Sequence, residues 1–322
     1  MNFSRKTLFW IIVLITLCGA FYLFEQKAED NRRAEVASLR LFPITAGSIG
    51  EFWITHKKED LELRAIRGQE GWRLVQPISV EGDEQAIEKL LNNVITARKD
   101  AVLFAQAGPA KLKELGLEAP ELEMGFRSEG REIVIVFGAS GPTHNVAYAM
   151  FRGNPNVFRI HADVREEARK DVYALRNKTV LDIEPLKMMR FEIERRGTQR
   201  VIIEHDKGKW TMLEPTRGKA RMDKVVESLY EIRNAEVKVF TDDKASDSAS
   251  YGLGSPMLRL TIFQGQSKVP YILSIGDKDR ANRGYFARTN QAENVFVVEE
   301  GMVDAIILNM GKWSEVAVSD SG

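Results

Sequence analysis

The hexapeptides LGLEAP (Leu115–Pro120) and YGLGSP (Tyr251–Pro256) both contain the pattern Gly-Leu-x-x-Pro, in a chain of 322 residues. A helix that ends on a left-handed residue favours glycine there, and the next residue often makes an apolar contact with the last helical turn. In AKLKELGL we therefore expect Gly116 to end a short helix, Leu117 to fold back on it, and Pro120 to prevent continuation.

The pattern belongs to a longer repeat, because other residues recur in the same order around it. The recurring landmarks, at offsets of 136 to 138 residues, are Trp72 and Trp210, Pro77 and Pro215, Gly116 and Gly252, Leu117 and Leu253, Pro120 and Pro256, Gly138 and Gly276, Tyr148 and Tyr285, and Phe158 and Phe296. One residue departs from the match, since Leu115 stands where the second copy has Tyr251. Order and spacing together indicate an internal duplication.

Each copy has the signals of strands, then a helix, then strands. Short apolar runs broken by charged and glycine-containing turns precede Pro77 and Pro215, and a proline cannot continue a strand ladder. Asp83 then predicts the cap of a helix with one apolar face, and we expect Asp223 to serve the second copy in the same way. The apolar positions of the two helices are Ile87, Leu90, Leu91 and Val94, and Val225, Val226, Leu229 and Ile232.

These landmarks resemble the family known as domain of unknown function 4340, over both repeats from about Leu41 to Glu299 and including the preceding apolar segment. The resemblance implies a membrane-anchored bacterial protein of the kind often encoded beside ABC-transporter components of the gliding-motility type. It implies no activity, no cofactor and no catalytic residues.

The N-terminal segment predicts a membrane anchor. Residues 8–24, LFWIIVLITLCGAFYLF, contain no charged residue, and their length of 17 residues is close to the minimum for a spanning helix. A signal-peptide cleavage site contains small residues, whereas this segment ends in bulky residues such as Phe21 and Phe24. Arg5 and Lys6 precede the segment but four basic residues follow it within Lys27–Arg40, so a bare count of charges opposes the expected orientation. A long domain is translocated largely regardless of loop charge, and we expect the bulk of the chain to be periplasmic, with a single pass through the bacterial inner membrane.

The sequence thus predicts an α+β fold with two tandem copies of an antiparallel-sheet-plus-helix module, preceded by one N-terminal transmembrane helix. The predicted parts are a cytoplasmic tail (1–7), an anchor (8–24), a charged stalk (25–40), module 1 (41–160), a connecting helix and turn (161–186), module 2 (187–299), and a C-terminal helix and tail (300–322). The apolar face of the last helix, with Val303 and Ile306, could cap the second sheet or dock a partner.

Composition excludes several classes of protein. There are 46 basic and 46 acidic residues, so no net field attracts nucleic acid. Cys18 is the one cysteine, which excludes an intramolecular disulfide and a thiolate metal cluster. We find no nucleophile-elbow, zinc-protease, phosphate-loop or paired-cysteine motif in the sequence, and we expect no cofactor and no catalytic or metal-binding residues.

Three kinds of residue remain as candidates for chemistry or binding. His205 lies between Glu204 and Asp206, which suggests acid-base chemistry, although a surface strand end accounts for it as well. The tryptophans of the repeat signature, Trp72 and Trp210, could stack on sugars, but their positions in strands favour burial in the core. Tyr148 and Tyr285 are candidates to line a ligand groove between the modules.

Three functional hypotheses follow. The first is a non-enzymatic accessory or scaffold protein of an envelope complex, associated with ABC-transporter subunits. The alternative is an extracytoplasmic protein that binds glycan or peptide in the groove between the modules. The third is a hydrolase centred on His205.

Overall fold

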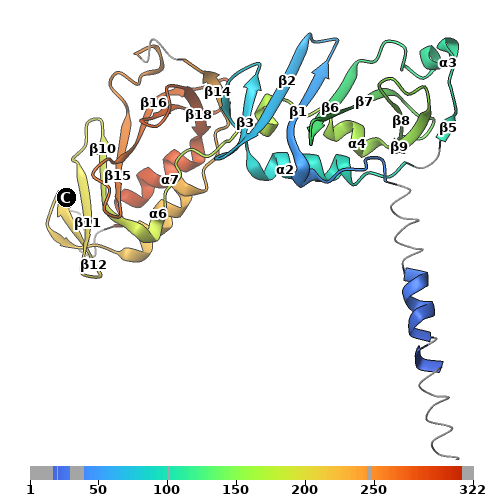
Figure 1. Cartoon of the computed structure of the whole chain (residues 1–322). Helices are drawn as coiled ribbons and strands as arrows, with labels where there is room; N and C mark the ends of the chain where they lie inside the picture. Colours follow the sequence, from blue (N-terminus) through green and yellow to red (C-terminus); the bar gives the residue numbers. More distant parts are fainter. Residues whose placement is uncertain (1–16, 20, 30–39, 100–101, 245–248, 314–322) are drawn as a thin grey trace, which may run out of the picture. The chain divides into compact units, whose positions relative to one another are not determined.

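The computed structural model describes residues 17–19, 21–29, 40–99, 102–244 and 249–313 (Figure 1). The chain divides into two compact units, Met1–Asn177 and Lys178–Gly322. The predicted connector, residues 161–186, is therefore shared between the units. We call the units the first and the second module.

The first module contains nine strands: β1 (Ile49–His56), β2 (Leu61–Gly68), β3 (Gly71–Gln76), β4 (Val80–Glu81), β5 (Val102–Phe104), β6 (Leu122–Ser128), β7 (Arg131–Ser140), β8 (Val146–Phe151) and β9 (Val157–His161). Its helices are α2 (Glu84–Ile95), α3 (Pro109–Glu114), α4 (Ala162–Glu167) and α5 (Val172–Leu175), and a short 3₁₀ turn, η1 (Ala46–Ser48), precedes β1. All strand pairs are antiparallel, in the order β4-β3-β2-β1-β6-β7-β8-β9-β5.

The second module repeats this plan strand for strand: β10 (Met188–Arg195), β11 (Val201–Asp206), β12 (Lys209–Glu214), β13 (Gly218–Lys219), β14 (Val239–Asp242), β15 (Leu258–Gln264), β16 (Tyr271–Asp279), β17 (Gly284–Thr289) and β18 (Val295–Glu299). Its helices are α6 (Met222–Arg233) and α7 (Glu300–Met310), with 3₁₀ turns η2 (Pro185–Lys187) and η3 (Ala249–Tyr251). The order β13-β12-β11-β10-β15-β16-β17-β18-β14 matches the first sheet position by position. The predicted duplication and the antiparallel-sheet-plus-helix module are confirmed.

The long helix of each module covers one face of its sheet (Figure 1). The apolar residues predicted for α2 are all buried, and its cap is the Asp83 carboxylate, which accepts a hydrogen bond from the backbone N–H of Ala86 at 3.0 Å. The second helix differs at its start. Arg221 is its N-cap residue and makes no side-chain cap, while Asp223 lies inside the first turn and pairs with Arg221 at 2.8 Å. The prediction that Asp223 caps α6 is wrong, because the helix begins two residues earlier than its capping position would require.

The ends of the two modules are also equivalent. The backbone N–H of Asp83 donates to the carbonyl of Leu175 at 2.8 Å, and the N–H of Arg221 donates to the carbonyl of Trp313 at 2.7 Å. In each case the last part of the module is tied to the N-terminus of its long helix. The C-terminal helix α7 buries Val303 and Ile306 in the second core, so its apolar face caps the second sheet.

Most of the predicted anchor lies outside the described residues, as do residues 1–7 and most of the stalk. Residues 17–19 and 21–29 are helical. Within the part of the chain that the structure describes, no helix has both the length and the apolarity that a membrane span needs.

Candidate functional site

The repeated Gly-Leu pair of the first module packs against Gly138, the repeated glycine within β7. Gly116 has a φ of +68°, and the N–H of Leu117 donates to the carbonyl of Leu112 at 2.7 Å, which is the predicted left-handed helix stop. The loop then lies against Gly138 in β7. A Cβ there would overlap the carbonyl oxygen of Leu115 and approach the Leu117 side chain to 2.9 Å.

The second module repeats this contact although its residues differ around it. Gly252 has a φ of +72°, and a Cβ on Gly276 would overlap the carbonyl oxygen of Tyr251 and lie 3.2 Å from the Leu253 side chain. The Tyr251 ring packs on Phe286 with centroids 5.1 Å apart, where the first module has the smaller Leu115. The signature glycines therefore permit a close approach of two backbone segments.

The other signature residues are also structural. Trp72 and Trp210 are buried in the cores, at 3% and 6% exposure, as the strand pattern favoured. Pro77 and Pro215 directly follow β3 and β12, and both follow cis peptide bonds. Pro120 and Pro256 precede β6 and β15 by two residues.

The proposed equivalence of Tyr148 and Tyr285 is wrong by one residue. Phe158 pairs with the alanine that follows Tyr148, whereas Phe296 pairs with the alanine that follows Phe286. Tyr148 therefore corresponds to Phe286, and a one-residue shift in a strand moves a side chain to the opposite face. Accordingly, Tyr148 packs in the small cluster around Leu115 and Leu117, while Tyr285 packs against the main core of its module. A groove between the modules stays a prediction.

His205 stacks on the signature tryptophan of the second module. The His205 and Trp210 rings have centroids 4.9 Å apart and an interplanar angle of 26°. In the first module the equivalent contact is made by Arg67, whose guanidinium carbon lies 4.8 Å from the Trp72 ring centroid. Among the described residues, no hydrogen bond or ion pair involves the His205 side chain. The two side chains thus share one structural position above the tryptophan.

We expect His205→Arg to leave the free energy of unfolding within about 0.5 kcal/mol of the original, because arginine already fills this position in the first module. Loss of the stacked ring in His205→Ala is expected to cost about 1 kcal/mol. Urea denaturation followed by tryptophan fluorescence measures both. Equal destabilisation by the two substitutions would show that the imidazole itself is needed.

The tryptophans differ in what surrounds their N–H groups. In the first module the backbone N–H of Trp72 donates to Glu84 at 3.1 Å, and its indole N–H donates to Glu88 at 3.2 Å. Beside Trp210, in contrast, lies an open cavity of about 740 Å³. The residues that line this cavity are Gly208, Lys209, Trp210, Thr211, Gly218, Lys219, Ala220, Arg221, Met222 and Asp223. We call it the Trp210 cavity, and it is the strongest candidate for a ligand site.

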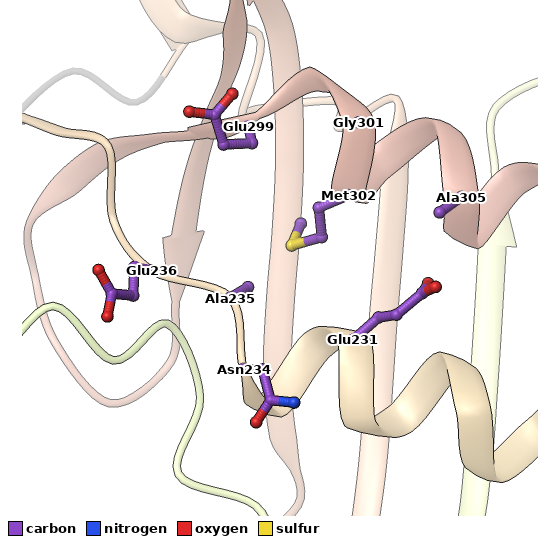
Figure 2. Close-up of a pocket in the computed structure, with 8 residues that line it drawn as sticks. All are labelled: Glu231, Asn234, Ala235, Glu236, Glu299, Gly301, Met302 and Ala305. Atoms are coloured by element: carbon purple, nitrogen blue, oxygen red, sulfur yellow. The ribbon is translucent and has the colours of Figure 1, made fainter.

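A second cavity of about 370 Å³ lies between the C-terminal end of α6 and the start of α7 (Figure 2). Glu231, Glu236 and Glu299 are on different sides of it, and their carboxylates do not converge (Figure 2). Glu299 is paired with Lys238 at 2.9 Å. Within the described residues no group of histidine, cysteine or acidic side chains could hold a metal ion.

The sheet faces that point away from the long helices carry different chemistry in the two modules. In the first, the Trp53 ring lies over Gly125, where a Cβ would overlap it. Guanidinium groups of Arg64 and Arg127 lie 5.0 Å and 5.9 Å from the ring centroid, and both pair with Glu51. Stacked cations and a carboxylate thus cover an aromatic ring on this face.

At the position of Trp53 the second module has Glu192. Its carboxylate is nearly buried, at 9% side-chain exposure, and is paired with Arg190 at 2.5 Å and with Arg200. On this face, arginines therefore cover a buried tryptophan in the first module and a buried glutamate in the second.

Fold and site together define a duplicated α+β protein whose repeated residues form its frame. The model of the family described as Domain of unknown function (DUF4340) matches residues 72–256 and 210–319. The chain belongs to this family. No curated protein and no protein of solved structure was found to match it.

Proposed function

We propose that the chain is a non-enzymatic accessory or scaffold protein of an envelope complex, held at the membrane by residues 8–24 and associated with ABC-transporter subunits. One observation carries the proposal: the residues that the two copies share are used for packing, whereas the sheet faces that point away from the long helices are built from different residues. A fold that is repeated with different outer faces is suited to a protein that binds two different partners.

The chemistry of the two faces supports the same proposal. Arginine is enriched in protein–protein interfaces, because its side chain combines apolar area with charge-assisted hydrogen bonds. Arg152 in the first module and Arg200 in the second both pair with a nearly buried glutamate, Glu123 and Glu192, while remaining 56% and 41% exposed. Each is available to a partner on the outer face of its sheet.

The test is photo-crosslinking in native membranes, with a photoreactive residue at Arg152 or at Arg200 in the full-length chain. We expect permease and ATPase subunits in stoichiometric amounts, identified by mass spectrometry after solubilisation in mild detergent. The matched control places the same group at Asn93, an exposed position of α2. Recovery of the chain alone from both outer faces, or equal crosslinking from Asn93, would contradict the proposal.

A further inference from the structure

The first module shows which chemistry satisfies the donors of the signature tryptophan. Glu84 and Glu88, one turn apart on α2, accept from the backbone and indole N–H groups of Trp72. Asp83 caps the same helix end. Carboxylates of the chain itself therefore satisfy both N–H groups of the tryptophan and cap the helix N-terminus.

The second module lacks all three at the equivalent positions. Arg221 replaces Asp83, Met222 replaces Glu84, and Val226 replaces Glu88. Met222 is 53% exposed and leaves the space open as the Trp210 cavity. No described group accepts a hydrogen bond from the backbone N–H or the indole N–H of Trp210.

The second module also has basic residues near its tryptophan, where the first module has carboxylates. Lys209 stands where the first module has Gly71, and it lines the cavity without an ion pair among the described residues. Arg221 lines it as well, paired with Asp223 on the exposed side. The N-cap residue of α6 provides no side-chain cap, so the positive end of this 12-residue helix is offset only by Asp223 in its first turn. Trp210, Lys209 and the N-terminus of α6 thus line one cavity where the first module holds carboxylates, and the one carboxylate of the lining, Asp223, is paired with Arg221.

We propose that the Trp210 cavity binds a carboxylate from outside the module, supplied by an acidic side chain of a partner polypeptide. The N–H groups of Trp210 are its hydrogen-bond donors, as those of Trp72 are for Glu84 and Glu88 in the first module. Lys209 supplies the opposite charge. The site needs neither the membrane anchor nor a transporter, so it can be tested independently of the proposed function.

The probes are the peptide Glu-Glu-Glu and the small dicarboxylate glutarate, titrated into full-length protein labelled with ¹⁵N at the tryptophan indoles. We expect a saturable downfield shift of the Trp210 resonance and none of the Trp72 resonance, whose N–H is already bonded to Glu88. The resonances are assigned with Trp210→Phe and Trp72→Phe. A Trp210 resonance that stays in place with both probes would overturn the proposal.

Variants separate a built site from general attraction of anions. Met222→Glu with Val226→Glu restores the carboxylates of the first module and is expected to abolish the shift, with unchanged Trp72 and Trp313 resonances reporting an intact fold. Lys209→Glu is expected to weaken binding roughly tenfold or more, whereas Lys268→Glu, in an exposed loop, makes the same charge change and leaves binding unaltered. Full binding in the Met222/Val226 double variant would overturn the site.

Further arms identify the source of the carboxylate. Binding of the peptide at least roughly tenfold tighter than glutarate supports a polypeptide, and equal affinity overturns that source in favour of a small dicarboxylate. A chain that ends at Trp313 tests residues 314–322, which contain Glu315 and Asp320. If removing them alone returns a downfield Trp210 resonance to its free position, the carboxylate belongs to this chain and the partner is overturned.

Discussion

Gly276→Ala is expected to lower the free energy of unfolding of the second module by about 3 kcal/mol, and Gly138→Ala to do the same in the first. A methyl group at either position would overlap the backbone oxygen of Tyr251 or Leu115. That oxygen belongs to a loop held by a left-handed glycine, so it cannot rotate away as a side chain could. The loop must lift from its strand, and the apolar contacts of Leu253 or Leu117 are lost with it.

Hydrogen exchange followed by mass spectrometry assigns the loss to one module. We expect faster exchange in β16 and η3 for Gly276→Ala, and in β7 and α3 for Gly138→Ala. The controls are Gly301→Ala in α7 and Gly50→Ala in β1, because a Cβ at either position meets no atom within 4 Å. Gly276→Ala with the stability of the Gly301 control would disprove the close approach as the reason for the repeated glycines.

The elements that local patterns predict best are those whose cause is local. The glycine stop of α3 and the apolar face of α2 depend on neighbouring residues, and both are as predicted. The pairing of β5 with β9 was not predicted, because Val102–Phe104 is short and its partner lies more than 50 residues away. The start of α6 differs from the prediction because the helix begins at Met222, after the N-cap residue Arg221, which has no capping side chain.

Matching the two copies by residue type alone also has a limit. The offset is 136 at Gly116 but 138 at Gly138, and Tyr285, at an offset of 137 from Tyr148, falls between these two values. Strand pairing shows that the offset in this region is 138, so the residue equivalent to Tyr148 is Phe286. The one-residue error reversed the face of the sheet, which a period of two residues makes unavoidable.

The sequence predicts part of what distinguishes the Trp210 cavity from the first module. At an offset of 138 the sequence already places Arg221, Met222 and Val226 against Asp83, Glu84 and Glu88. The sequence does not show that the tryptophan N–H groups of the first module point toward these positions. The hydrogen bonds of Trp72 supply that direction, and with it the meaning of the substitutions.

Trp313→Ala is expected to cost the second module about 3–5 kcal/mol, the range for removing a large buried aromatic side chain. Trp313 is fully buried, packs edge-on to Phe191 with centroids 5.6 Å apart, and donates its indole N–H to the Ser228 hydroxyl at 3.2 Å. Leu175 fills the equivalent position in the first module with a smaller side chain and no hydrogen bond of this kind. The second core is therefore completed by a residue beyond the last helix.

Two variants divide that cost between packing and hydrogen bonding. Trp313→Phe keeps most of the apolar contact, and we expect it to lose about 1–2 kcal/mol. Ser228→Ala is the milder control, since it removes the acceptor and leaves the ring in place. Guanidinium denaturation gives the energies, and hydrogen exchange should locate the loss in α6 and β10. If Trp313→Ala unfolded at the denaturant concentration of the original, the last residues would be an appendage. A loss near the predicted range makes Trp313 part of the module, with its carbonyl fixing the start of α6 through Arg221 and its ring closing the core.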